Sequence, residues 1–129
     1  TPSMLCVEDY IVALNWAKAI GGLPALIARA DANAGVVQRW IDQRGFAQNL
    51  ARDEATRSNT SVCLTLEADE AALKRMVKLL ETEGVAYDIG SYRDAPPGLR
   101  IWCGATVETS DVAALMPWLD WAYAQATAA

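Results

Sequence analysis

The sequence of 129 residues contains no histidine and only three lysines. Without histidine, the chain cannot form a Ser-His-Asp or Cys-His catalytic pair, nor a zinc site built on imidazole. It also lacks the side chain best suited to proton transfer near neutral pH. Lys18, Lys74 and Lys78 are expected on the polar faces of helices, where none is desolvated enough to act as a nucleophilic amine. We therefore expect no catalytic residue and no metal site within this chain.

Cysteines and long apolar segments are also scarce. Cys6, Cys63 and Cys103 lie far apart, form no CxxC pair and have apolar neighbours, so we expect free, buried thiols in a reducing compartment. No apolar run approaches the roughly 20 residues that cross a bilayer, and no signal peptide is visible. These features predict a cytoplasmic protein without a membrane partner.

Positive charge is limited as well. The chain has 16 acidic and 11 basic residues, a formal net charge of −5, and no stretch that resembles a basic stripe. Nucleic acid is therefore not an expected partner. The hydrophobic share of 53% is typical of one globular domain with a modest core, and we assign residues 1–129 to a single domain.

The pattern of apolar residues and helix-ending glycines predicts an α+β fold. Helices are expected over residues 5–20 and 24–44, after the Asp69 cap, and over a last segment from Thr109 or Ser110. Strands are expected over residues 61–67, 85–89 and 99–103, with a possible short strand around residues 46–50. The expected order is α-α-β-α-β-β-α, with a small three-stranded, largely antiparallel sheet covered by helices.

Two arginines flank a Pro-Pro-Gly turn in the segment SYRDAPPGLRIWCG (residues 91–104). If Leu99, Ile101 and Cys103 face the core, then Arg100 lies on the opposite face of its strand. A guanidinium fixed on a rigid strand is a suitable receptor for a carboxylate. Arg93 and Arg100 are therefore candidates to bind an anionic substrate, and the alternative is that both form surface ion pairs with Asp88 or Asp94.

Residues 87–104, the opening residues 1–4 and the segment RSNTSVC (residues 57–63) resemble the C-terminal small domain of the phosphoserine aminotransferase family. The resemblance covers nearly the whole chain, in order. It implies a fold-type I transaminase that uses pyridoxal 5'-phosphate and transfers an amino group between glutamate and 3-phosphohydroxypyruvate in serine biosynthesis. It also implies a homodimer acting on small molecules: phosphoserine, glutamate and their keto acids.

Several residues acquire expected roles from this resemblance. Arg100 matches the arginine that binds the substrate α-carboxylate, and Arg93 matches one that helps to bind the substrate phosphate. Tyr92 stands where many relatives have histidine, and Thr1 matches a threonine that reaches the cofactor phosphate of the neighbouring subunit. The lysine that forms the Schiff base lies upstream in this family, in the large cofactor-binding domain. We therefore expect this chain to be a piece of a longer protein and to be inactive by itself.

Two other interpretations remain open at this point. The chain is alternatively a stand-alone α+β module that binds an amino or keto acid for regulation, using the same arginines without a cofactor. The second of these interpretations is that the chain is part of another transaminase of the same fold, with a different anionic substrate.

Overall fold

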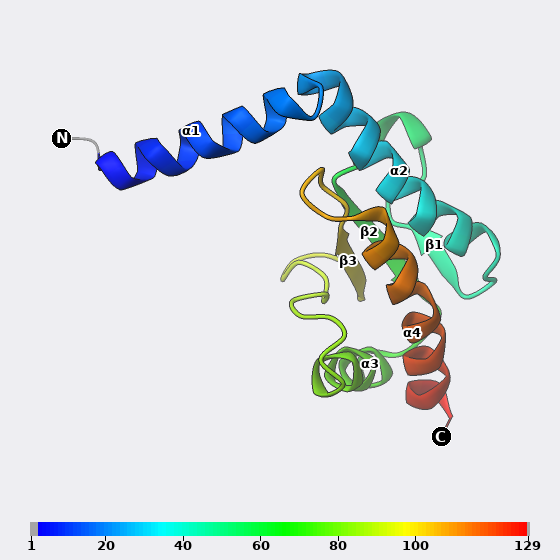
Figure 1. Cartoon of the computed structure of the whole chain (residues 1–129). Helices are drawn as coiled ribbons and strands as arrows, with labels where there is room; N and C mark the ends of the chain where they lie inside the picture. The colour runs from blue at the N-terminus through cyan, green and yellow to red at the C-terminus, as the bar shows by residue number, and fades with distance from the viewer. Residues whose placement is uncertain (1–2, 129) are drawn as a thin grey trace.

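The computed structural model describes residues 3–128 and confirms the α+β class (Figure 1). The elements follow in the order α1 (Met4–Ala19), α2 (Gly22–Asp42), β1 (Ala47–Asn49), a 3₁₀ turn (Glu54–Thr56), β2 (Ser61–Leu66), α3 (Glu70–Thr82), β3 (Gly98–Trp102) and α4 (Thr109–Thr127). Helices α2, α3 and α4 lie beside a small sheet, α1 projects away from it, and the ends of the described chain lie far apart. The expected cap of the third helix is confirmed, because the Asp69 side chain accepts a hydrogen bond from the Ala72 amide.

The sheet contains the strands β1, β2 and β3 in this order, and both pairs are antiparallel. The expected strand over residues 85–89 is wrong, and the short β1 is the third strand in its place. Asp88 has a left-handed backbone with φ of 51°, which interrupts an extended run. Only the end of this segment meets β3, through a bridge between Gly90 and Leu99. The observed order is therefore α-α-β-β-α-β-α.

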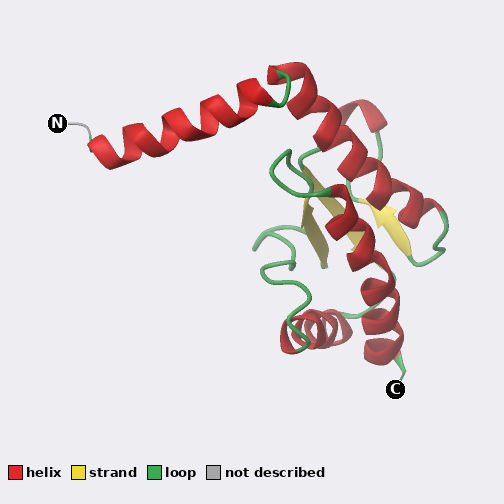
Figure 2. Ribbon diagram, viewed as in Figure 1, coloured by secondary structure: helices red, strands yellow, loops and turns green. Residues whose placement is uncertain are grey.

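Alternation along the central strands separates a covered face of the sheet from an open one. Val62, Leu64 and Leu66 of β2 are buried, and Val62 and Leu64 pair with Ile101 and Leu99 of β3. Helices α2, α3 and α4 pack against this face (Figure 2). The fully buried side chains of the core come from helices, from strands and from the residue that follows β3: Val37, Leu64, Met76, Leu80, Leu99, Cys103 and Leu119.

A buried asparagine connects α2 to the loop that follows β3. Asn33 is 0% exposed, and its amide nitrogen lies 3.2, 3.2 and 3.0 Å from the carbonyl oxygens of Cys103, Gly104 and Val107. Its side-chain oxygen accepts a hydrogen bond of 2.6 Å from the Thr109 hydroxyl at the start of α4. One side chain thus satisfies the polar backbone of a loop that is packed against the core.

A second polar connection joins the end of α2 to α4. Arg44 donates two hydrogen bonds to Asp120, from Nε to Oδ1 at 2.8 Å and from Nη2 to Oδ2 at 2.6 Å. The Trp40 indole donates a third, at 3.0 Å to Oδ1. The bonds from Arg44, and to a smaller extent the bond from Trp40, hold the pKa of the Asp120 carboxyl below its usual value, against the opposing effect of its partial burial.

We expect this pair to make folding sensitive to acid. Because the pKa of Asp120 is lowered in the folded state, its stabilising effect is complete above about pH 4 and is lost as the pH falls below that value. Asp120→Asn should lower the melting temperature by roughly 3–5 °C at pH 7. Thermal unfolding followed by circular dichroism between pH 7 and pH 2.5 measures the difference, which should shrink below pH 4.

The exposed Asp9 on α1 supplies a matched control for this experiment. Asp9→Asn removes the same charge without touching the connection between α2 and α4, and should leave the melting temperature nearly unchanged across the range. A difference between wild type and Asp120→Asn that stays constant down to pH 2.5 would contradict the assignment.

Helix α1 projects away from the rest of the chain (Figure 1). Val7, Ile11 and Leu14 repeat at helical spacing and so predict an inward face for this helix, but the prediction is wrong, because no residue of α1 is buried. Gly21 and Gly22 have positive φ values of 116° and 69°, and α1 and α2 are bent by 82° at this break. Within residues 3–128, no single helix is long and apolar enough to cross a membrane, although the bent pair of α1 and α2 meets that test by length and composition.

The three cysteines are free, as expected, but they differ in burial. Cys103 is 0% exposed, and burial raises the pKa of its thiol to about 11. Cys63 is half-buried, and the expectation of burial is wrong for Cys6, which is exposed on α1. Cys6 is thus a further residue left uncovered on this helix.

Candidate functional site

Arg100 lies on the face of the sheet that the helices leave open. It occupies the middle of β3, where its neighbours Leu99 and Ile101 point into the core. Its strand partner is Cys63, and the next pair on the same face is Trp102 and Ser61. The alternation expected from sequence therefore holds, and the strand presents the guanidinium away from the core.

An open pocket of about 700 Å³ surrounds this arginine. Its polar part is formed by two segments, the open face at the end of the sheet and the chain between α3 and β3, and the chain after β3 adds apolar residues. Asp88 and Tyr92 come from the second of these segments, and the exposed Trp102 from the first. The apolar part of the lining includes Val85, Ala86, Ile89, Ile101, Val107 and Leu115. A pocket that is mostly apolar and contains one fixed cation is suited to orient a small anionic ligand.

Tyr92 packs directly on the guanidinium of Arg100. The carbon Cζ of Arg100 lies 4.5 Å from the centre of the Tyr92 ring, within the range of a cation–π contact. The Tyr92 hydroxyl lies 3.5 Å from the Ser61 hydroxyl. The Ser61 hydroxyl first, and the Arg100 guanidinium second, lower the pKa of the Tyr92 phenol. Tyr92 in turn raises the pKa of Arg100, so this guanidinium stays charged.

Asp88 supplies the carboxylate that pairs with Arg100 in this structure. Its Oδ2 atom lies 2.7 Å from Nη2 of Arg100, and its backbone oxygen lies 3.3 Å from the same nitrogen. The Arg100 side chain is 24% exposed and that of Asp88 is 92% exposed. The interpretation of Arg100 as a member of an ion pair with Asp88 therefore agrees with its geometry here.

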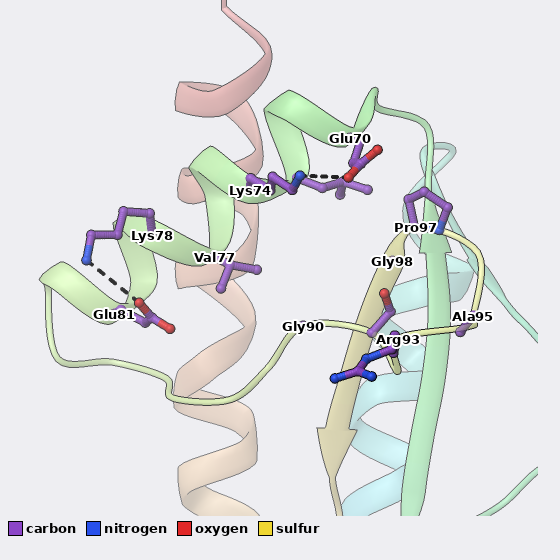
Figure 3. A pocket seen from close by; sticks show the side chains of 12 residues that line it. Glu70, Lys74, Val77, Lys78, Glu81, Gly90, Arg93, Ala95, Pro97 and Gly98 are labelled. Atoms are coloured by element: carbon purple, nitrogen blue, oxygen red, sulfur yellow. Dashed lines mark ion pairs between the residues drawn. The ribbon is translucent and has the colours of Figure 1, made fainter.

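Arg93 lines a different groove, of about 520 Å³, between α3 and the loop that precedes β3. In Figure 3 its side chain extends from this loop into the space beside Val77 of α3. Lys74 and Lys78 line the same groove, where Lys74 pairs with Glu70 at 2.7 Å and Lys78 with Glu81 at 3.9 Å (Figure 3). The structure thus brings Tyr92 to Arg100 but leaves the neighbouring Arg93 in another cavity.

Thr1 is the remaining candidate, and Arg57 belongs to the segment 57–63 that shares in the resemblance. Thr1 lies outside the described residues. Arg57 binds the backbone oxygens of Ala51 and Arg52, at 3.1 and 3.3 Å, and so holds its own loop together. It has no place in the pocket around Arg100.

Two pocket residues were missed by sequence reasoning. Ser61 was expected only as part of a strand. It precedes the buried Val62, so its side chain lies on the opposite face of the strand, the face that Arg100 shares. Asp88 was considered as an ion-pair partner but not as a lining residue, because its segment was expected to form a regular strand. The left-handed backbone of Asp88 interrupts that strand.

Known proteins similar to this chain belong to the family that the residues around this pocket resemble. No family model matches the chain. Two curated relatives, the phosphoserine aminotransferases of Methanosarcina mazei and Methanosarcina barkeri, are each 50% identical over 123 residues. The match covers 95% of this chain but only 33% of either relative. The chain thus spans about a third of the length of the curated relatives that it matches.

Solved structures give the same result for the fold. The phosphoserine aminotransferase from Bacillus circulans subsp. alkalophilus matches with a TM-score of 0.86 and 25% identity, over 97% of this chain and 34% of that one. Another phosphoserine aminotransferase, studied for radiation damage of its Schiff base, matches with a TM-score of 0.74 over 86% of this chain. These findings confirm the resemblance that residues 87–104 indicated.

Proposed function

Since this chain is homologous to about a third of phosphoserine aminotransferase, we propose that it is the small domain of such an enzyme. The whole protein would transfer the amino group of glutamate to 3-phosphohydroxypyruvate, giving 2-oxoglutarate and phosphoserine for serine biosynthesis. It would act as a cytoplasmic homodimer, and the free cysteines are in keeping with a reducing compartment. The observation that carries this proposal is Arg100, a charged guanidinium on a rigid strand at the wall of an open pocket.

Arg100 is the residue to which we assign the substrate α-carboxylate. Both substrates of the proposed reaction share an α-carboxylate, so one fixed guanidinium serves both halves of the reaction. Tyr92 stacks on this guanidinium and restricts its orientation. Because β3 is held by β2 along its length, the charge is placed by the sheet and does not depend on a flexible loop.

The exposed helix α1 supports the idea that a further domain contacts this chain. Its large apolar side chains are uncovered on several sides, with exposed fractions of 71% for Leu5, 66% for Tyr10 and 67% for Val12. A helix that is apolar all round is normally buried on more than one side. The other two thirds of a relative's polypeptide are long enough to supply that cover. We assign α1 to the contact with the large domain.

The residues of this chain do not fit the covalent attachment of pyridoxal phosphate. A Schiff-base lysine needs a desolvated amine. All three lysines are exposed, and Lys74 and Lys78 have side-chain exposures of 75% and 77% with glutamate partners. The cofactor would supply the electron sink for amino transfer, and we assign its binding to the large domain.

We expect the 129-residue chain alone to be inactive. It should show no transamination of phosphoserine and no aldimine absorbance with pyridoxal phosphate, while a longer enzyme in which a large domain precedes this chain should show both. A stoichiometric aldimine with turnover on the short chain would overturn the proposal. Tight binding of glutamate by the short chain, without activity in the longer enzyme, would favour the stand-alone regulatory module.

Arg93 decides between phosphoserine and another anionic substrate. If it binds the substrate phosphate, Arg93→Ala should lower kcat/KM for phosphoserine about tenfold and leave unphosphorylated serine nearly unchanged. The Asp88 carboxylate pairs with Arg100 and therefore does not neutralise the positive charge of Arg93 in the structure. The measured quantity is the ratio of kcat/KM for phosphoserine over serine in the longer enzyme.

Arg52→Ala is the matched control, because it removes an exposed guanidinium from a different loop. It should leave the ratio unchanged. The same ratio in wild type and Arg93→Ala would place Arg93 outside the substrate site. Its position in a groove separate from Arg100 would then be its position in the enzyme as well.

A further inference from the structure

Arg100 carries a carboxylate partner from its own chain at the position where a ligand carboxylate would bind. The Asp88 contact of 2.7 Å is the charge-assisted hydrogen bond that an amino-acid carboxylate would make with the same guanidinium. Both side chains line one pocket. A ligand that binds Arg100 through this nitrogen must therefore compete with Asp88.

The Asp88 side chain is placed so that it can leave at little cost. It is 92% exposed, whereas the Arg100 side chain is only 24% exposed. An ion pair with one partner in open solvent contributes little to stability, because water replaces the lost contact readily. Both bonds from Arg100 to Asp88 come from Nη2. A ligand carboxylate that binds two guanidinium nitrogens would displace a partner that uses one.

The backbone of Asp88 is held while its carboxylate is free to move. Next to it, Ile89 is 4% exposed, and its carbonyl oxygen accepts a hydrogen bond of 2.9 Å from the Arg100 amide. Asp88 itself has the left-handed φ of 51°, a conformation that aspartate tolerates better than most residues. The carboxylate is thus tethered beside Arg100 and returns when the ligand leaves.

Arg100 does not depend on this carboxylate for its position. The Tyr92 ring stacks on the guanidinium at 4.5 Å, and the backbone oxygen of Asp88 lies 3.3 Å from Nη2. Both contacts remain when the Asp88 side chain turns away. We propose that Asp88 is a built-in competitor, whose carboxylate occupies Arg100 until a substrate carboxylate displaces it. The proposal rests on the proposed function, in which Arg100 binds that carboxylate.

The competition has a measurable consequence for affinity. An internal partner reduces the apparent affinity of a ligand by the fraction of molecules in which Arg100 is free. For an exposed ion pair this factor is about two to five. Removing the Asp88 carboxylate should therefore tighten the binding of a carboxylate by about threefold, without any new contact.

The test measures the binding of acetate to the 129-residue chain at constant ionic strength, by the NMR signal of the Arg100 side-chain Nε–H. Asp88→Asn removes the charge, and Asp88→Gly removes the side chain while permitting the left-handed backbone. Both should lower the dissociation constant for acetate about threefold. Asp94→Asn is the matched control, since it removes one exposed carboxylate from the same loop and should leave the constant unchanged.

Each other outcome has a distinct meaning. If both Asp88 variants bind acetate as wild type does, or more weakly, the competitor role is wrong while the receptor role of Arg100 stands. An equal gain in Asp94→Asn also overturns it, because the effect then reflects only the general loss of negative charge. If the Arg100 signal does not respond to acetate in any of these proteins, both the proposed receptor role and the inference fall.

Discussion

Replacing Arg100 by lysine is expected to lower kcat/KM for glutamate and for phosphoserine alike, by about 10- to 150-fold. Lysine retains the positive charge but loses the planar fork that binds a carboxylate through two nitrogens. It also loses the stacking of the guanidinium on the Tyr92 ring. The value of kcat/KM should fall by a similar factor for both substrates, because the α-carboxylate is the group that they share. Steady-state kinetics of the longer enzyme with each substrate measures the effect.

The control for this prediction separates the loss of a ligand contact from a loss of folding. Arg100 lies on the open face of the sheet, outside the apolar core, so Arg100→Lys should leave the melting temperature nearly unchanged. Arg52→Lys makes the same chemical change on an exposed loop and should leave the kinetics of the enzyme unchanged. Normal turnover of both substrates by Arg100→Lys would remove the central residue of the proposed site.

Replacing Asn33 by alanine is expected to destabilise the fold by about 3 kcal/mol. Asn33 is 0% exposed, and its amide group bonds three carbonyl oxygens of the loop between β3 and α4. Alanine leaves these oxygens without that partner, in a region with little access to water, and leaves a small cavity. Chemical denaturation should show this loss, and the melting temperature should fall by roughly 10 °C.

Asn49→Ala provides the matched control, with the same side chain removed from a half-buried position. Asn49 donates one bond of 2.8 Å to Gln38, so its removal should cost less than about 1 kcal/mol. A loss of stability in Asn33→Ala no larger than in Asn49→Ala would show that the loop does not depend on this side chain.

Local sequence patterns predicted much of the secondary structure. Asp69 was expected to cap a helix because a short acidic side chain followed by an apolar repeat is typical of a helix start, and the cap is present. The strand around Arg100 was expected from its apolar residues, and its alternation placed Arg100 on the open face. The cap is a contact between neighbouring residues, and the alternation follows from the two-residue period of an extended backbone, so a sequence pattern is sufficient to indicate both.

The errors arise where distant contacts decide the conformation. Residues 85–89 are as apolar as a strand, but the sheet accepts β1 at its other edge, and the left-handed Asp88 ends the extended run. The apolar repeat of α1 predicted an inward face, yet a helix can bury such a face only where another element lies beside it.

The sequence by itself determined the class of the fold, the lack of histidine in this chain, and the side of β3 on which Arg100 lies. Those conclusions follow from composition and from the two-residue period of a strand. Only the tertiary structure decided that Tyr92 stacks on Arg100, that Asp88 pairs with it, and that Arg93 lies in another groove. The segment between α3 and β3 has no regular hydrogen-bond ladder to fix its path. Its side chains are therefore directed by packing against the helix and the sheet, which sequence spacing does not encode.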